Sequence, residues 1–467
     1  MIETHDELET QEMPAPEYRT TPLLGIIPDI MRRGAFQTLT KAMLEHGGFV
    51  KLKIGPMPAY LVSDPVVLQR VLRDNYRNYR KPTMLYEAVE QLTGKGLVVS
   101  EGDFWLRQRR MIQPHMHRKQ LAGLTDTKTR AIGTVLDRWS KVATPEMELD
   151  LGEAMSHITM DVITQTMFGS DALEADEMQR VSAALTQALD YVSLRGFLSI
   201  LPNWVPLPGQ GDFAGNLQSI RNTIMRLIEL RRNDYSERSD LLSMLLSAVD
   251  EVTNETMTDE QVFNEAMTVF LAGFETTATA LMWLWYVLDS HPKIEARLRA
   301  EIDAALGERI PQFEDLPKLP YSMMVFKEVL RLYPPAPLLP REVVAGDLLG
   351  EHGVKAGDTL LMFFYGLHRN PRIWDQPEVF EPERFTPENE SKRHRFAYLP
   401  FSGGPRQCVG DDFAMLEGVL ALVMVMQRYR IRMVSDKEVY PKFGATLRPS
   451  HPIRGILTAL QMASSAH

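Results

Sequence analysis

Hydrophobic positions recur at helical spacing along most of this chain, and short alternating runs are few. Residues 124–246 have mostly the pattern of amphipathic helices. Residues 49–54 alternate and, with residues 59–62, flank a Gly-Pro pair, which predicts a β-hairpin. Asp64, followed by proline, then predicts the start of a helix. The pattern as a whole indicates a mainly α fold with small β-sheets.

The longest periodic stretch begins at Thr258, which forms a capping-box pattern with Gln261, and continues to about Ser290. A helix of roughly 30 residues, at ~1.5 Å per residue, spans about 50 Å and crosses a molecule of this size. Its middle is polar, because Glu275 and Thr276 lie between apolar flanks. A charge in that setting is costly without a purpose or a partner. The alternative to a functional pair is a threonine bonded to its own helix, with Glu275 at a wet edge.

Residues 401–410 hold the single cysteine, Cys408, in a glycine-rich turn before an apolar helical run. Glycines on both sides allow a sharp turn and a close approach to another group. The sulfur is placed near a helix N-terminus, where free N–H groups and the helix dipole favour the thiolate. Such a thiolate is a nucleophile or a metal ligand, and Arg406 could bind an anionic group beside that metal. The alternative is a structural cysteine buried in the turn.

Composition and charge narrow the function classes. A chain of 467 residues is long enough to enclose a cofactor. The net charge of −10 argues against nucleic acid as a partner. One cysteine excludes an intramolecular disulfide and fits a reducing compartment.

The ends and linkers of the chain bear on its organisation. Residues 1–18 carry no secretory signal, and no run approaches the roughly 18 apolar residues of a spanning helix. We therefore expect a soluble, cytoplasmic protein without a membrane anchor. Residues 1–19 are expected to be a flexible lead, and residues 20–467 a single domain, since no internal repeat or linker is visible.

The pattern Phe-x-x-Gly-x-Arg-x-Cys-x-Gly, complete from Phe401 to Gly410, resembles the haem-ligand signature of the cytochrome P-450 family. Further family motifs follow the family's order and spacing. They are Trp-x-x-x-Arg at 105–109, Ala-Gly-x-Glu-Thr-Thr at 272–277, Glu-x-x-Arg at 328–331 and Pro-Glu-Arg-Phe at 382–385. The resemblance runs from about Pro22 to the C-terminus. It implies a single-domain fold with haem between the long central helix and the helix after the cysteine loop.

The resemblance implies a haem-thiolate monooxygenase in which Cys408 is the axial ligand of haem b, iron protoporphyrin IX. The thiolate pushes electron density into the iron and favours O–O cleavage. The residues implied to hold the cofactor are Trp105, Arg109, Arg341, Phe401, Arg406 and Gly410, with the haem propionates bound by the arginines and the indole N–H.

Two further groups of residues take their roles from the resemblance. In the long helix, Glu275 and Thr276 relay protons, while Ala272 and Gly273 leave room above the haem. Behind the haem, a buried structural cluster is implied, made of Glu328, Arg331 and Arg384.

The implied substrate site is apolar, which predicts an apolar or amphiphilic small molecule. Residues 81–102 form the loop over the substrate, and residues 201–209 belong to a mobile lid. The implied pocket residues are Leu97, Val98, Val269, Ala272, Leu338, Leu339 and Phe443. Fatty acids, terpenoids, steroids and polyketide-like products all remain open as substrates.

Other reactions and partners are also to be considered. A peroxygenase or another haem-thiolate reaction is the alternative enzyme, and a haem sensor or a haem-free structural protein are alternatives outside catalysis. No flavin or iron–sulfur segment is fused, so electrons are expected from a ferredoxin or flavodoxin and its NAD(P)H-dependent reductase. Basic side chains expected to dock that partner are Arg107, Arg110, Arg118, Lys119, Lys392, Arg393 and Arg395. A monomer is expected.

Overall fold

The computed structural model describes residues 13–142, 146–169, 175–197, 205–233, 240–434, 437–442, 444 and 446–460. Two compact units are distinguished. The first comprises Met1–Pro82, Pro337–Glu378 and Arg393–Gln407, and the second comprises Thr83–Ala336, Val379–Lys392 and Cys408–His467. The expected fold class, mainly α with small sheets, is confirmed. The expected single domain over residues 20–467 stays a prediction.

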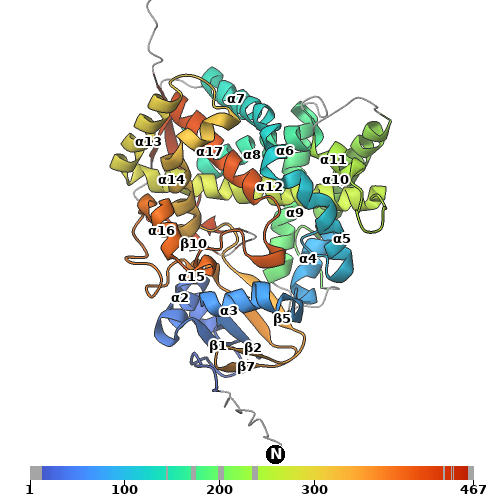
Figure 1. Cartoon of the computed structure of the whole chain (residues 1–467), viewed down its shortest axis with the longest axis vertical. Helices are drawn as coiled ribbons and strands as arrows, with labels where there is room; N and C mark the ends of the chain where they lie inside the picture. The colour runs from blue at the N-terminus through green and yellow to red at the C-terminus, as the bar shows by residue number, and fades with distance from the viewer. Residues whose placement is uncertain are drawn as a thin grey trace, which may run out of the picture. The chain divides into compact units, whose positions relative to one another are not determined.

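The first unit is built on a five-stranded sheet of order β1-β2-β8-β5-β3 (Figure 1). Its strands are β1 (Phe49–Ile54), β2 (Met57–Val62), β3 (Tyr79–Arg80), β5 (Leu339–Val343) and β8 (Thr359–Met362), and β6 (Asp347–Leu349) pairs separately with β7 (His352–Val354). β1 and β2 are antiparallel, with Phe49 opposite Val62, so the predicted hairpin is confirmed. β8 joins β2 in parallel, which brings two segments about 300 residues apart into one sheet.

Short helices accompany this sheet: α1 (Ile27–Arg33), α2 (Ala35–His46), α3 (Pro65–Gln69), α15 (Phe364–Leu367), and the single turns η1 (Arg70–Asp74), η2 (Tyr76–Asn78), η6 (Arg395–Ala397) and η7 (Gly404–Arg406). The predicted helix after Asp64 is present. The Asp64 carboxylate accepts hydrogen bonds from the N–H groups of Val66 and Val67, at 2.8 and 3.1 Å, and so caps the helix.

Residues 13–19 differ from the expected flexible lead. Their backbone is paired with the sheet: Tyr18 N–H donates to the carbonyl of Lys51 at 2.9 Å, and Lys51 N–H donates to Pro16 at 2.8 Å. The Tyr18 side chain is buried. The backbone pairs and the buried ring hold this part of the segment, which the polar composition of the N-terminus did not indicate.

Asp347 ties β6 to the segment after α3. Burial by itself raises the pKa of Asp347, but hydrogen bonds from Arg70, Tyr79 and Asn75 outweigh it and bring the pKa to about 2. The folded pKa lies below the reference value of 3.8, so this stabilisation is complete above about pH 4 and is lost as the pH falls toward 2.

We expect Asp347→Asn to lower the free energy of unfolding by about 1–2 kcal/mol at pH 7, a figure reduced for solvent screening at the half-exposed Arg70. The difference from wild type should shrink between pH 4 and pH 2. Urea unfolding at several pH values measures it. A difference that stays constant down to the lowest pH at which both proteins fold would contradict this role for Asp347.

The second unit is a helical assembly. Its helices are α4 (Thr83–Thr93), α5 (Gly102–Ile112), α6 (Arg118–Ala122), α7 (Thr125–Val142), α8 (Leu151–Phe168), α9 (Ala175–Phe197), α10 (Gln210–Arg232), α11 (Leu241–Ser247), α12 (Asp259–Asp289), α13 (Pro292–Ala305), α14 (Pro320–Leu332), α16 (Pro387–Lys392) and α17 (Asp411–Arg428), with turns η3 (Gln113–Met116), η4 (Phe313–Lys318) and η5 (Pro382–Phe385). α12 packs along α8 and also contacts α17 and α14 (Figure 1).

The long central helix agrees with its prediction. Thr258 is its N-cap, and the capping box is complete: the Thr258 hydroxyl accepts from Gln261 N–H, while the Gln261 side chain accepts from Thr258 N–H. Of the described residues, α12 alone is long and apolar enough to cross a membrane, but two thirds of its apolar window is buried inside the protein, as in a core helix.

Small sheets complete the second unit. β12 (Arg454–Ala459) lies between β4 (Glu146–Asp150) and β9 (Tyr429–Met433), and β10 (Pro441–Lys442) pairs with β11 (Arg448–Pro449). The turn before β11 is fixed to α12, because the buried indole N–H of Trp283 donates to the carbonyl of Leu447 at 2.7 Å. Trp283 also stacks on Tyr333, with ring centroids 4.3 Å apart. This turn, called the C-terminal turn below, is therefore held beside the C-terminal part of α12.

Candidate functional site

Cys408 directly precedes the first turn of α17. Its side chain reaches solvent, yet protein packs around the sulfur so that burial raises the pKa of the thiol to about 11. The backbone N–H of Gly410 and the charge of Arg109 lower the pKa, but they do not outweigh burial. The N–H of Gly410 thus acts in the expected direction, but burial has the larger effect on the pKa of the thiol. A coordinated metal cation favours the thiolate and would offset that burial.

Arg109 supplies positive charge beside this cysteine. It lies on α5, one turn after Trp105, whose indole is buried, and its Nε donates to Gln113 Oε1 at 3.0 Å. Burial lowers the pKa of Arg109, and the nearby charges of Cys408 and Asp411 oppose that shift. A thiol that needs a cation, with a half-buried guanidinium next to it, fits an iron porphyrin that carries anionic propionates.

A buried lysine–glutamate pair lies behind the first turn of α17. Lys128 on α7 and Glu417 on α17 are both fully buried, with Nζ and Oε2 4.0 Å apart. Lys128 Nζ donates to the carbonyl of Phe413 at 2.9 Å. Burial lowers the pKa of Lys128 to about 7 and raises that of Glu417 to about 8, each opposed by the partner's charge. This pair, which the sequence analysis missed, fixes the start of α17 against α7.

The first unit holds the residues before Cys408. Phe401 and Arg406 are half-buried on either side of Gly404, which has a positive φ of 68°. A Cβ on Gly404 would lie 1.9 Å from the carbonyl oxygen of Leu72, so only glycine fits there. Arg341 is buried on β5 and donates to the carbonyl of Pro340 at 2.8 Å. The predicted pocket residues of this unit, which are Leu338 and Leu339, are half-buried.

One face of α12 is open although the helix is mostly buried. Ala272 is exposed, and Val269 and Thr276 are half-buried. Spacings of three and four residues place these three side chains on one face of the helix. Two predicted pocket residues and the predicted proton-relay hydroxyl thus share an accessible face.

Gly273 packs closely against α8. A Cβ at this position would lie 2.9 Å from Cδ1 of Ile163, so the glycine serves the close packing of α12 on α8. The exposed residue on the accessible face is Ala272. Room above a haem at Gly273 stays a prediction.

The predicted acid–alcohol pair is present in sequence but divided in space. The Thr276 hydroxyl donates to the carbonyl of Ala272, one turn back, at 2.6 Å. Glu275 Oε1 instead accepts from the Thr446 hydroxyl at 3.0 Å and from Arg448 Nη2 at 3.4 Å. This is the alternative arrangement, a back-bonded threonine, except that Glu275 has partners on the C-terminal turn.

The loop between α4 and α5 is anchored on α12. Glu265 is fully buried, and its carboxylate accepts from Leu97 N–H at 3.0 Å and from Gln108 Nε2 at 3.1 Å. Gly94 and Gly96 are pressed against α12, because a Cβ on either would lie within 2.0 Å of the Asn264 or Thr268 side chain. These contacts place the loop near the accessible face. The charge of Glu265 within an apolar run was the sequence signal for this anchor.

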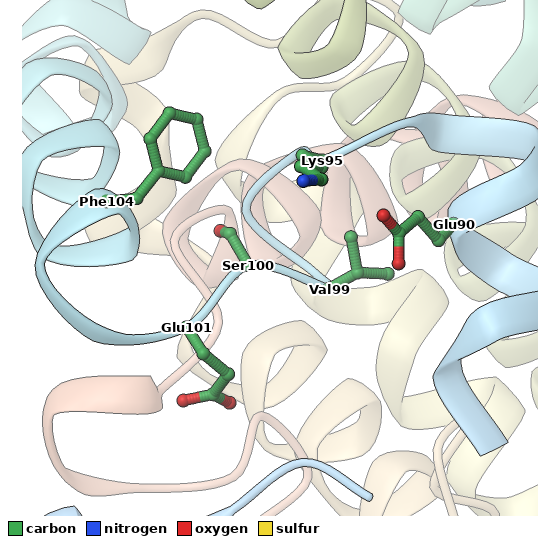
Figure 2. A pocket seen from close by; sticks show the side chains of 6 residues that line it. All are labelled: Glu90, Lys95, Val99, Ser100, Glu101 and Phe104. Carbon is green, nitrogen blue, oxygen red and sulfur yellow. The ribbon is translucent and has the colours of Figure 1, made fainter. Parts of the chain in front are cut away.

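A pocket of about 510 Å³ opens beside the same loop. Figure 2 shows Glu90 of α4 and Phe104 of α5 on either side of it. The loop supplies Lys95, Val99, Ser100 and Glu101. Leu97 is buried and Val98 is exposed, and neither of these predicted pocket residues lines this cavity.

The structural cluster of Glu328, Arg331 and Arg384 is assembled in the second unit. Arg331 binds Glu328 through two hydrogen bonds, Nε to Oε2 at 2.7 Å and Nη2 to Oε1 at 2.8 Å, and both side chains are fully buried. Arg384 Nε lies 3.4 Å from Glu328 Oε1. Glu381 N–H also donates to Glu328, at 2.8 Å. The carboxylate therefore joins α14 to the segment around η5.

Some predicted residues lie outside the described part of the chain. Phe443 and residues 201–204 of the expected lid are among them. The side chains of Arg118 and Lys119 are likewise not described. Arg107 and Arg110, expected to dock a partner, instead pair with Asp250, at 3.8 and 2.9 Å.

Comparison with known proteins agrees with these features. The sequence profile of the family described as "Cytochrome P450" matches residues 14–456. A solved structure, the "cytochrome P450DA heme domain", superposes with a TM-score of 0.85 over 95% of this chain and 97% of that one, at 23% identity, and so shows the same fold.

Three curated relatives come from Streptomyces. Cyclooctatin synthase of S. melanosporofaciens is 34% identical, over 88% of this chain and 89% of the relative. Cyclooctat-9-en-7-ol 5-monooxygenase of the same species is 34% identical, over 89% of each chain. Pentalenene oxygenase of S. avermitilis is 31% identical, over 94% of this chain and 96% of the relative.

The chain belongs to the cytochrome P-450 family of haem proteins. It is therefore an oxygen-incorporating oxidoreductase, with haem as its cofactor.

Proposed function

We propose that this protein is a monooxygenase that inserts one oxygen atom into an apolar or amphiphilic small molecule, by hydroxylation or epoxidation. The observation that supports it best is the accessible face of α12, where Val269 and Ala272 are apolar and Thr276 carries a hydroxyl. Neither apolar side chain is fully buried, so this face combines an accessible surface for hydrocarbon with a proton donor.

In this proposal Cys408 holds haem as a thiolate, and bound haem supplies the activation of dioxygen and the transfer of one oxygen atom. Arg109 and Trp105 of α5 bind a propionate. Arg341 and Arg406 would also bind propionates, and Phe401 and Gly410 would shape the cysteine loop.

The protons come from α12. The Thr276 hydroxyl leaves the carbonyl of Ala272 by rotation about χ1 and then donates toward the open face of the helix. The Glu275 side chain, after turning from Thr446, passes protons to that hydroxyl.

The proposed substrate is a terpenoid hydrocarbon or its alcohol. Two relatives are named for pentalenene and cyclooctat-9-en-7-ol. An apolar face with a single hydroxyl suits such a molecule, which offers few groups for hydrogen bonding.

We also propose that electrons arrive from a separate ferredoxin or flavodoxin in the cytoplasm. Asp250 pairs with Arg107 and Arg110, and Glu255 lies 3.4 Å from Arg107, so two carboxylates compensate the two arginines and these contribute little to docking. Of the other expected cations, Lys392 pairs with Glu388, Arg393 lies over the ring of Trp374, and Arg395 is exposed. Among the described residues, Arg395 is therefore the best candidate for docking the electron donor.

One observation favours a second candidate, a peroxygenase. Glu275 is bound to Thr446 and Arg448 rather than directed to Thr276. A reaction that uses peroxide receives both of its protons with the oxidant and needs no relay through the carboxyl group.

The proposal is tested with haem-loaded protein, a surrogate ferredoxin and its reductase. Terpenoids, fatty acids, steroids and polyketides are screened for a substrate-induced Soret shift, and hits are turned over under ¹⁸O₂. We expect one labelled oxygen atom in the product of a terpenoid. Product formed with hydrogen peroxide, but never with the electron donors, would replace the monooxygenase by the peroxygenase.

A further inference from the structure

Arg448 on β11 lies between carboxylates of two different helices. Its Nη2 is 3.4 Å from Oε1 of Glu275 on α12, and its Nη1 is 2.8 Å from Oδ1 of Asp190 on α9. The exposed fraction of the side chain rises from 16% at Glu275 through 38% at Arg448 to 56% at Asp190. One guanidinium thus joins the acid in the core helix to an acid at the surface of α9.

The Glu275 end of this link is well anchored. The Thr446 hydroxyl donates to the same oxygen, Oε1, and in turn accepts from the Thr279 hydroxyl at 3.1 Å. Thr446 and Thr279 are both buried, so their hydroxyl groups are directed by the protein rather than by water. The carboxylate is consequently held toward the C-terminal turn and not toward Thr276.

Arg448 keeps its positive charge in this setting. Burial lowers its pKa, but the charge of Glu275 and the hydrogen bond with Asp190 outweigh that effect, and the pKa lies above its ordinary value. Arg448 is therefore a permanent cation shared by two acids. Its contact with Asp190 is the shorter one, and a shift of α9 that breaks it leaves the guanidinium free to close on Glu275.

We propose that Arg448 is a positioning residue that sets the direction of the Glu275 carboxylate. Through its pair with Asp190, it makes that direction depend on the position of α9. With α9 as in this structure, Asp190 draws the guanidinium outward and holds it 3.4 Å from Glu275. Without Asp190, Arg448 binds Glu275 more tightly. The proposal rests on the proposed function insofar as Glu275 is a proton donor in turnover.

The catalytic arm of the test measures how the electrons divide between product and peroxide. Arg448→Gln should lower the peroxide fraction at least threefold, because the carboxylate is then held by Thr446 and turns to Thr276 more readily. Substrate affinity from the Soret titration should change less than twofold. In a Glu275→Gln background, Arg448→Gln should change the peroxide fraction no further, because it acts through that carboxylate. Arg448→Lys keeps the charge and should bring the peroxide fraction part of the way back to the wild-type value.

A loss of product from Arg448→Gln, or any change that is equally large with and without Glu275→Gln, would overturn the positioning role, since a purely structural residue behaves in that way. Asp190→Asn should lower the product fraction in the wild-type background and leave it unchanged in Arg448→Gln. The same loss in both backgrounds would overturn the coupling to α9.

A second arm does not depend on turnover. Hydrogen exchange of the haem-loaded protein, followed by mass spectrometry, should show at least threefold faster exchange in the α9 peptides of Arg448→Gln and Asp190→Asn. Arg454→Gln is the matched control, because Arg454 on β12 forms an exposed pair with Glu148 at 3.0 Å and contacts neither acid. Unchanged α9 exchange in both variants overturns the link. If wild type forms no product from any substrate, the proposed function fails, while this arm still decides the link.

Discussion

Replacing Cys408 with alanine is expected to abolish oxygenation and to remove the red-shifted band that the reduced protein shows under carbon monoxide. Cys408 is the only thiol in the chain, so no other side chain can supply a thiolate to the iron. Product formation with any donor should fall to background. The carbon monoxide difference spectrum and turnover of the best substrate measure both effects.

Two controls separate loss of the ligand from loss of the fold. Far-ultraviolet circular dichroism should match wild type, because the side chain of Cys408 reaches solvent and does not support the core. Cys408→Ser should behave like Cys408→Ala in the spectrum, since a hydroxyl with its high pKa does not replace a thiolate. A variant without the cysteine that keeps the red-shifted band would assign the ligand elsewhere.

Glu328→Gln should lower the free energy of unfolding by about 3–5 kcal/mol, the usual cost of leaving a buried charge unpaired. Arg331 is fully buried and would lose both charge-assisted bonds to the carboxylate, and the N–H of Glu381 would keep only an amide oxygen as its acceptor. Urea unfolding followed by tryptophan fluorescence measures the change.

The matched control lies on the same helix. Lys327 pairs at 2.8 Å with Glu390 on α16, the helix that follows η5, but both side chains are partly exposed. Glu390→Gln should therefore cost only about 0.2–1 kcal/mol. If Glu328→Gln does not fold, Arg384→Lys, which keeps the charge beside Glu328, gives a milder destabilisation to compare. Equal stability of wild type, Glu328→Gln and Glu390→Gln would contradict a structural role for the cluster.

The elements that carry strong local signals could be predicted from the sequence. The capping box at Thr258 set the start of α12, and alternation around residues 49–62 indicated the hairpin. The signature ending in Cys408 indicated the family, because several fixed residue types are required in one short turn. Each of these features depends on residues that are close together in the sequence, so each can be recognised from the sequence.

Features that depend on distant partners could not be predicted. Gly273 was interpreted as room above a cofactor, and its close contact with Ile163 on another helix could not be seen in the sequence. Glu275 looked like the partner of Thr276, but Thr446 and Arg448, more than 170 residues away, set its direction. The burial of Lys128 opposite Glu417 is equally invisible, because neither residue's own surroundings identify the partner.

The anchoring of the loop before α5 has a consequence for redesign of substrate range. Gly94 and Gly96 leave no space for any side chain, and the buried carboxylate of Glu265 fixes the backbone at Leu97. Libraries that vary the two glycines or Glu265 will mostly yield proteins with a dislodged loop. Variation at Val98, which is exposed, changes a side chain on a backbone that stays in place. The side chains of this loop can therefore be varied one at a time while its backbone keeps its position.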